Sequence, residues 1–155
     1  MALTYRAKLA RMLNGFPEPM TKLPEAASQT FKWGDLVFMS GGYVTICGAD
    51  PASIAGIAME NGHNSTAGAY DVDILFVTAD TLIQMQVYHA TEANNVIEAT
   101  DLFKDFGIAV TSNVWYVDKA DVSATRVRVV EFIDPLGTAN GRVAVQVLAA
   151  NRMLA

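Results

Sequence analysis

The chain has 155 residues, of which 52% are hydrophobic and 17% are charged, and its formal net charge is -5. This length suits one folded domain, and the charged fraction lies below that of a typical soluble domain. The acidic balance argues against a nucleic-acid partner, because proteins that bind nucleic acids carry a basic surface. The single cysteine, Cys47, excludes an intramolecular disulfide and a cysteine-clustered metal site.

The first 16 residues predict a short basic amphipathic helix. Apolar residues recur there at helical spacing, Thr4 is a start signal and Asn14-Gly15 a stop signal. The segment holds three of the 11 basic residues and no acid, which leaves eight basic against 16 acidic residues, or -8, for the remainder. Either the helix packs on its own domain, or it is an arm that docks on a neighbour. The residues expected to bind a partner in the second case are Tyr5, Arg6, Lys8, Leu9, Arg11, Met12, Leu13 and Phe16.

Three prolines, Pro17, Pro19 and Pro24, follow this segment and predict an extended linker. We therefore expect an N-terminal arm and proline-containing linker over residues 1–30 and a β-rich domain over 31–155. Charges interrupt the apolar residues near the start, so we expect no secretory signal. No apolar run approaches the roughly 20 residues that span a bilayer.

From Phe31 onward the pattern predicts strands and turns. Residues 36–40 and 43–47 flank Gly41-Gly42, a two-residue hairpin signal. Residues 82–88 alternate, so that we expect Gln84 and Gln86 to face outward and the apolar residues between them to face the core. The other expected strands are 54–59, 72–77, 108–110, 114–118, 126–133 and 142–148.

Two departures from this strand pattern are expected. Residues 100–106 have helical character, and Gly107 would end that helix. The apolar face changes at Val129-Val130, which predicts a β-bulge. No internal repeat is detected. The fold class expected is mainly β, an antiparallel β-barrel or sandwich with a short helix and an N-terminal arm.

Side chains able to do chemistry are few and scattered. His63 lies in a polar loop and is expected to be solvated, whereas His89 follows a strand and is expected to cap its end. Neither belongs to a hydrolytic motif. Asp71 and Asp73 share a strand face, and Asp101 and Asp105 would share a helix face, but each pair offers few oxygens for a metal. We therefore assign no catalytic, cofactor-binding or metal-binding residue.

The aromatic residues are expected mainly in the core, because they bury large areas. Trp33 precedes the first strand of the body, and Trp115-Tyr116 lies within a later one. Tyr43, Tyr70 and Tyr88 could lie outside. A subset on an outer face would mark a subunit interface.

Two runs carry a resemblance to a known family. Residues 32–47 read Lys-Trp-Gly-Asp-Leu-Val-Phe-Met-Ser-Gly-Gly-Tyr-Val-Thr-Ile-Cys, and residues 50–59 read Asp-Pro-Ala-Ser-Ile-Ala-Gly-Ile-Ala-Met. With later stretches at 87–91, 107–110, 115–118 and 134–145, the chain over roughly 30–150 resembles the decoration, or cement, proteins of tailed-bacteriophage capsids.

The resemblance implies a virion structural protein on the capsid exterior, made in the bacterial host cytoplasm. Such a protein binds the major capsid protein as a homotrimer and bridges capsomers, which stabilises the expanded head. It implies no enzyme activity, cofactor, nucleic acid or membrane. The alternatives are another virion β-module, from the tail tube, tail tip or a fibre, or less favourably a small β-barrel enzyme or sugar-binding module.

Overall fold

The computed structural model describes residues 7–15 and 19–153. It is mainly β, with 45% strand and 6% helical residues, which confirms the expected fold class. Helical structure in the described residues consists of three 3-10 turns, η1 (Glu92–Asn94), η2 (Ala99–Asp101) and η3 (Ala149–Asn151). The strands of the first half are β1 (Lys8–Met12), β2 (Met20–Pro24), β3 (Leu36–Ser40), β4 (Tyr43–Ile46), β5 (Gly56–Ala58) and β6 (Asp71–Phe76). Those of the second half are β7 (Thr81–Tyr88), β8 (Asp105–Thr111), β9 (Val114–Asp118), β10 (Val127–Phe132) and β11 (Arg142–Val147).

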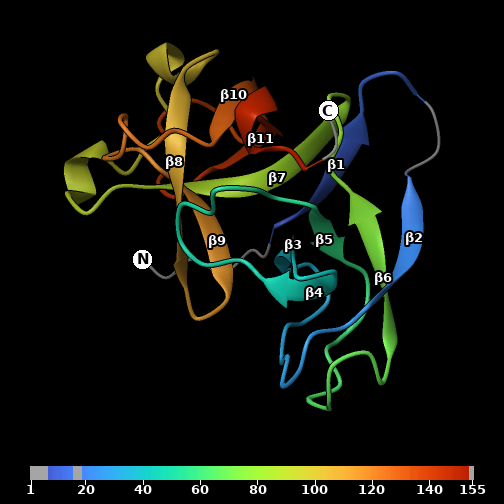
Figure 1. The fold of residues 1–155 in the computed structure, drawn as a ribbon. Coiled ribbons are helices and arrows are strands. Elements are labelled where there is room, and N and C mark those ends of the chain that lie inside the picture. Colours follow the sequence, from blue (N-terminus) through green and yellow to red (C-terminus); the bar gives the residue numbers. More distant parts are fainter. Residues whose placement is uncertain (1–6, 16–18, 154–155) are drawn as a thin grey trace.

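The second half of the chain forms a closed barrel. Its strands follow the order β7-β11-β10-β8-β9, and β9 returns to pair in parallel with the end of β7. All other ladders in this barrel are antiparallel. Strand β1 pairs with the first half of β7, on the opposite side from β11, and so extends the same sheet (Figure 1).

The first half forms a second, smaller sheet that nearly closes. Its order is β2-β6-β5-β3-β4, and all of its ladders are antiparallel. A single parallel bridge between Glu25 and Val44 joins the two outer strands. The N–H of Ala26 donates to the carbonyl oxygen of Val44 at 3.0 Å, which adds one hydrogen bond to this closure. Figure 1 shows this group of strands beside the barrel of the second half.

The two halves have the same topology. Counted from its own first strand, each half has the order first, fifth, fourth, second, third, and its first and third strands meet in parallel. The hairpin between the second and third strands has a two-residue turn in both, Gly41-Gly42 and Ser112-Asn113. All four turn residues have positive φ, between 50° and 87°, as a type I′ turn requires. The structure therefore contains a repeat that the sequence does not reveal.

A buried aspartate precedes the second strand in each half. Asp35 accepts the N–H of Lys32 at 2.7 Å, and Asp101 accepts the N–H of Glu98 at 2.9 Å. Both carboxylates thus close a turn with the residue three positions earlier, and both are followed by leucine. This shared turn supports the equivalence of the two halves.

The hydrophobic core joins the two halves. A small cluster fills the first half and includes Val37, Val44 and Ile74. A larger cluster fills the second barrel and also takes in Leu36 and Leu75 from the first half. Because adjacent residues of a strand point to opposite faces, Leu36 faces the larger cluster and Val37 the smaller one. The sheet of the first half therefore contributes one face to its own small cluster and the other to the larger cluster, which joins it to the second half.

Several sequence predictions are confirmed at residue level. Gly41-Gly42 joins a two-stranded hairpin, and the strand expected at 114–118 has those bounds. The pairing of β10 with β11 shifts register between Val129 and Glu131, which is the predicted bulge.

The helix predicted over residues 1–16 is wrong where the structure describes it, since Lys8–Met12 is strand β1. Leu9 pairs with Ile83 and Met12 with Thr81, and the register shifts between Leu9 and Arg11. This bulge places Leu9 and Met12, three residues apart, on the same face, so a bulged strand imitates helical spacing. Thr4, Tyr5, Arg6 and Phe16 lie outside the described residues.

The expected division into an arm and linker at 1–30 and a body at 31–155 does not follow the described structure. Strand β1 belongs to the sheet of the second barrel, and β2 belongs to that of the first. Ala7 is fully buried and Glu25 is 3% exposed. The described parts of both the expected arm and the expected linker therefore belong to the folded body.

Two further expectations are corrected. The helix expected at 100–106 is reduced to the 3-10 turn η2, because β8 already begins at Asp105, and Gly107 lies within that strand. Gln84 and Gln86 were expected to face outward into solvent, but both are buried. Their strand β7 has neighbours along both edges, and the side chains of the adjacent strands flank both glutamines.

We predict that Gly56→Ala destabilises the protein. A Cβ at Gly56 would collide with the carbonyl oxygen of Leu75 and would lie 2.6 Å from Cγ2 of Ile74. This overpacking costs about 2 kcal/mol or more, which for a chain of this length lowers Tm by about 4–8 °C. Gly48→Ala is the matched control, because nothing lies within 4 Å of its Cβ. Thermal unfolding by circular dichroism distinguishes the two, and equal Tm values would contradict close packing of β5 on β6.

Candidate interaction site

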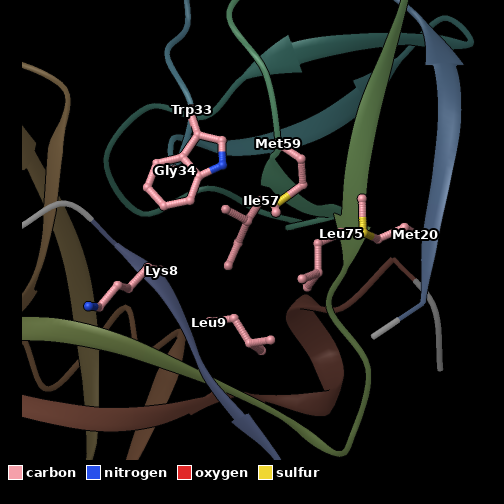
Figure 2. A pocket seen from close by; sticks show the side chains of 8 residues that line it. All are labelled: Lys8, Leu9, Met20, Trp33, Gly34, Ile57, Met59 and Leu75. Atoms are coloured by element: carbon pink, nitrogen blue, oxygen red, sulfur yellow. The ribbon is translucent and has the colours of Figure 1, made fainter. Parts of the chain in front are cut away.

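Edge strand β1 borders an apolar pocket of about 240 Å³ (Figure 2). Lys8 and Leu9 of β1 line one side of it, and residues of the first half line the rest. Trp33 and Met20 are 51% and 52% exposed, which is unusual for such large apolar side chains on a pocket wall. The apolar side chains that the first half contributes to this pocket are Met20, Trp33, Ile57, Met59 and Leu75.

A rigid turn holds the backbone of Trp33. Asp35 closes the turn by donating its N–H to the carbonyl oxygen of Lys32 at 2.9 Å. Gly34 has a φ of 91° and donates its N–H to Ala58 at 2.8 Å. The N–H of Trp33 donates to Oδ1 of Asn61 at 3.0 Å. The indole is therefore presented to solvent from a fixed backbone.

A second pocket, of about 300 Å³, lies across β1, β7, β11 and β10 of the six-stranded sheet. Lys8, Gln84, Ala144 and Glu131 line it, and the strand register places them in one row, from β1 through β7 and β11 to β10. Arg11 also lines it and binds Glu131 at 2.8 Å. This ion pair joins the two outer strands of the row, with Gln84 and Ala144 between them. We call this the Gln84 pocket.

Gln84 is the unusual residue of this pocket. It is 5% exposed, and its Nε2 has no hydrogen-bond partner. By contrast, Nε2 of the neighbouring Gln86 donates to the carbonyl oxygen of Asn140 at 2.7 Å. A buried amide N–H without a partner costs free energy that a well-packed apolar side chain would not.

The structure brings several predicted partner-binding residues to these pockets. Lys8 and Leu9 line both, and Arg11 lines the Gln84 pocket. Met12 instead accepts a hydrogen bond from the Thr81 hydroxyl at 3.7 Å. Leu13 is exposed just beyond β1. Tyr5, Arg6 and Phe16 lie outside the described residues, and the role of Trp33 and Gln84 was not predicted.

His63 is an exposed loop residue, as expected, and it is also held in place by specific contacts. Its Nδ1 lies 2.7 Å from Oε2 of the buried Glu25, which also accepts the backbone N–H of His63 at 2.8 Å. The imidazole stacks on Tyr70, with ring centroids 4.1 Å apart. This carboxylate therefore fastens the loop after β5 to the end of β2.

The acidic pairs considered as metal ligands have other partners. Asp73 binds Lys22 at 3.2 Å, and Asp105 binds Arg128 at 2.7 Å. Asp101 is buried against Lys119 at 2.8 Å and does not share a helix with Asp105. Within residues 7–15 and 19–153, no group of three or more potential ligands is placed to hold a metal.

Burial leaves Cys47 unreactive, because it raises the pKa of the thiol to about 12. A thiol with this pKa has almost no thiolate at neutral pH.

The imidazole of His89 takes part in a local hydrogen bond, since its Nδ1 accepts the N–H of Thr91 at 2.9 Å. None of the helices in the described part is long and apolar enough to cross a membrane.

Two carboxylates meet where the halves join. The N–H of Asp50, in the first half, donates to Ile108 of β8 at 2.8 Å, and Oδ1 of Asp50 accepts the N–H of Ile108 at 2.8 Å. Gly107 leaves room for them, since its Cβ would lie 2.6 Å from Asp121 and 2.8 Å from Asp50. Burial and then repulsion from Asp121 raise the pKa of Asp50. Hydrogen bonds from the N–H groups of Ala124 and Ser123 lower the pKa of Asp121.

The comparisons with known proteins add no family. No protein-family model matches the chain, and no curated protein matches it.

We predict that Asp50→Asn stabilises the protein at pH 7. The pKa of Asp50 lies above its ordinary value of 3.8, so ionising this group weakens the folded state. The penalty is absent below the unfolded pKa and grows as pH rises through the folded one. Asparagine keeps the acceptor for Ile108 and tolerates the positive φ of 41°. Tm of Asp50→Asn should therefore exceed that of wild type at pH 7 and match it near pH 3.

Asp71→Asn is the control for this experiment, because it removes a negative charge from an exposed position on β6. It should shift the free energy of unfolding by less than about 0.5 kcal/mol. The difference in Tm between Asp50→Asn and wild type is compared at pH 7 and at pH 3. A more negative difference at pH 7 would show that the ionised carboxylate stabilises the junction.

Proposed function

We propose that this protein is a decoration protein of a tailed-bacteriophage capsid. It binds the outside of the expanded shell as a trimer and stabilises it by bridging capsomers. The resemblance of residues 30–150 to that family supports the proposal, as does the mainly β fold. Its surface works by shape and apolar contact, and every bound copy stabilises the assembled shell by mass action.

The observation that carries the proposal is the apolar pocket beside β1. Two large apolar side chains, Trp33 and Met20, are about half exposed around it. Exposed apolar surface of this kind marks sites where another protein binds. Tryptophan is also the residue type most enriched among the side chains that dominate binding energy.

The joined halves suit a bridging role. The large hydrophobic cluster includes residues of both, so a load on one half is transmitted to the other through close-packed side chains. A decoration protein must resist the separation of neighbouring capsomers, and a rigid body does so better than two units on a linker.

We predict that Trp33→Ser weakens binding to shells. Purified protein is mixed with expanded, undecorated heads of the matching phage, which are then pelleted. Wild type should sediment with the heads, and loss of a central tryptophan contact should reduce affinity about 30-fold or more. The control is Val122→Ser, an exposed apolar side chain outside the pocket that should change affinity less than about twofold. Both variants should keep the wild-type Tm.

Failure of the wild-type protein to sediment with matching heads would reject the proposed function. The native mass in solution provides an independent check, since a trimer is expected. A hexameric ring would instead favour a tail-tube protein.

A further inference from the structure

The two halves differ in the segment that follows their equivalent buried aspartates. In the first half β3 begins directly after Asp35, and its first residue, Leu36, is fully buried. In the second half the three residues 102–104 lie between Asp101 and the start of β8 at Asp105, and all three are exposed. The second half therefore adds a short exposed turn where the first half enters its strand at once.

The backbone of this turn has a conformation that favours glycine, yet it carries Phe103. Leu102 has φ -64° and ψ 128°, Phe103 has φ 61°, and the N–H of Lys104 donates to the carbonyl oxygen of Asp101 at 3.1 Å. These values define a type II β-turn, in which the residue at the position of Phe103 is usually glycine or asparagine.

The same residue also opens a β-bulge. The N–H of Phe103 donates to the carbonyl oxygen of Val129 at 2.8 Å, and the N–H of Val129 donates to that of Lys104 at 3.1 Å. Two residues thus face one, in the kind of bulge whose first residue is left-handed and usually glycine. A bulky residue with positive φ is strained, and its hydrogen bonds fix the backbone in this state.

The side chain of Phe103 adds little to the packing of the single chain. It is 66% exposed, the highest value among the large apolar side chains of the described residues, and the neighbouring Leu102 is 38% exposed. Phe103 thus combines backbone strain with apolar exposure, although glycine would avoid both. A residue that breaks two local rules without a gain in packing indicates a functional contact.

The charges around the turn favour a second copy of this chain as the partner. The whole chain has a net charge of -5, so its copies repel one another on average. Around the turn, three acids and three bases balance, and ion pairs of 2.7–3.0 Å join five of the six. They are Glu98, Asp101, Asp105, Lys104, Lys119 and Arg128. An identical surface can therefore approach this one without net repulsion.

We propose that Phe103, flanked by Leu102, forms the contact between copies of this chain in the trimer. Residues close to a symmetry axis meet their own counterparts, so three rings pack together at the three-fold axis. Each ring then buries the apolar area that it exposes in the single chain. The inference rests on the trimer of the proposed function, and it places the trimer contact apart from the Trp33 pocket.

We predict that Phe103→Gly abolishes the trimer without unfolding the chain. Glycine suits the left-handed backbone, so far-UV circular dichroism and cooperative thermal unfolding should be retained. Sedimentation equilibrium of the full-length protein over a concentration series should give three chains for wild type and one for the variant. Loss of the aromatic contact should weaken association at least about 30-fold. Phe103→Asn, which also tolerates positive φ, should give the same result.

Two control variants match Phe103→Gly in one property each. Ser112→Gly also places glycine at an exposed position with positive φ, 50°, in the turn between β8 and β9. Val122→Ser also removes an exposed apolar side chain, which is 57% exposed. Both should sediment as trimers, with association within about twofold of wild type.

Several results would overturn the inference. They are a wild-type mass other than three chains, a trimer that persists in both Phe103 variants, and unfolding of Phe103→Gly, which would give Phe103 a structural role. Loss of head binding by a Phe103→Gly trimer would also overturn it, because Phe103 would then contact the shell.

Sedimentation with heads separates this inference from the proposed function. If wild type pellets with heads and the Phe103 variants remain trimers, the decoration function stands and the inference fails. If wild type is a trimer that Phe103→Gly dissociates, but it does not pellet with matching heads, the trimer contact stands and the decoration function fails.

Discussion

Strand β7 has hydrogen-bonded neighbours along both of its edges, and the rest of the structure depends on this arrangement. One edge pairs with β11, and the other is shared by β1 and β9. The shared edge closes the second barrel and at the same time attaches the N-terminal strand. Seven of the eight residues of β7 are buried, on both faces of the strand, so each polar side chain on it needs a partner. Gln86 has one within the protein, whereas Gln84 faces a pocket.

The two halves share a strand order but close in different ways. In the second barrel, three residue pairs join β7 to β9. In the first half, one bridge joins the corresponding strands. There the carboxylate of Glu25 adds contacts to the loop around His63, and side-chain hydrogen bonds take the place of missing ladder bonds. The same topology can thus be completed by backbone pairing or by a buried acid.

Much of the fold could be predicted because strands and tight turns have local signatures. The Gly41-Gly42 hairpin and the bulge near Val129 depend on residues close together in sequence. The failures have non-local causes. A bulge gave Leu9 and Met12 helical spacing, and burial of Gln84 depends on strands far away in the chain. The repeat escaped detection because pairing order is shared, while the residues that form it differ.

The site could be predicted only in part for the same reason. Lys8, Leu9 and Arg11 were chosen for their apolar and basic character, and they do line the pockets beside β1. The opposite walls come from Trp33 and from β7, β10 and β11, which no local pattern connects with the N-terminal segment.

The place of β1 in the chain has a consequence for the order of folding during synthesis. Strands β2 to β6 are contiguous, so the first half has all of its strands once Phe76 has left the ribosome. Strand β1 is made earlier than any of them, yet its pairing partner β7 is made after all of them. Strand β1 therefore cannot pair with β7 until after the strands of the first half have been made. Pairing of β1 is then a late folding event, because it requires β7 of the second half.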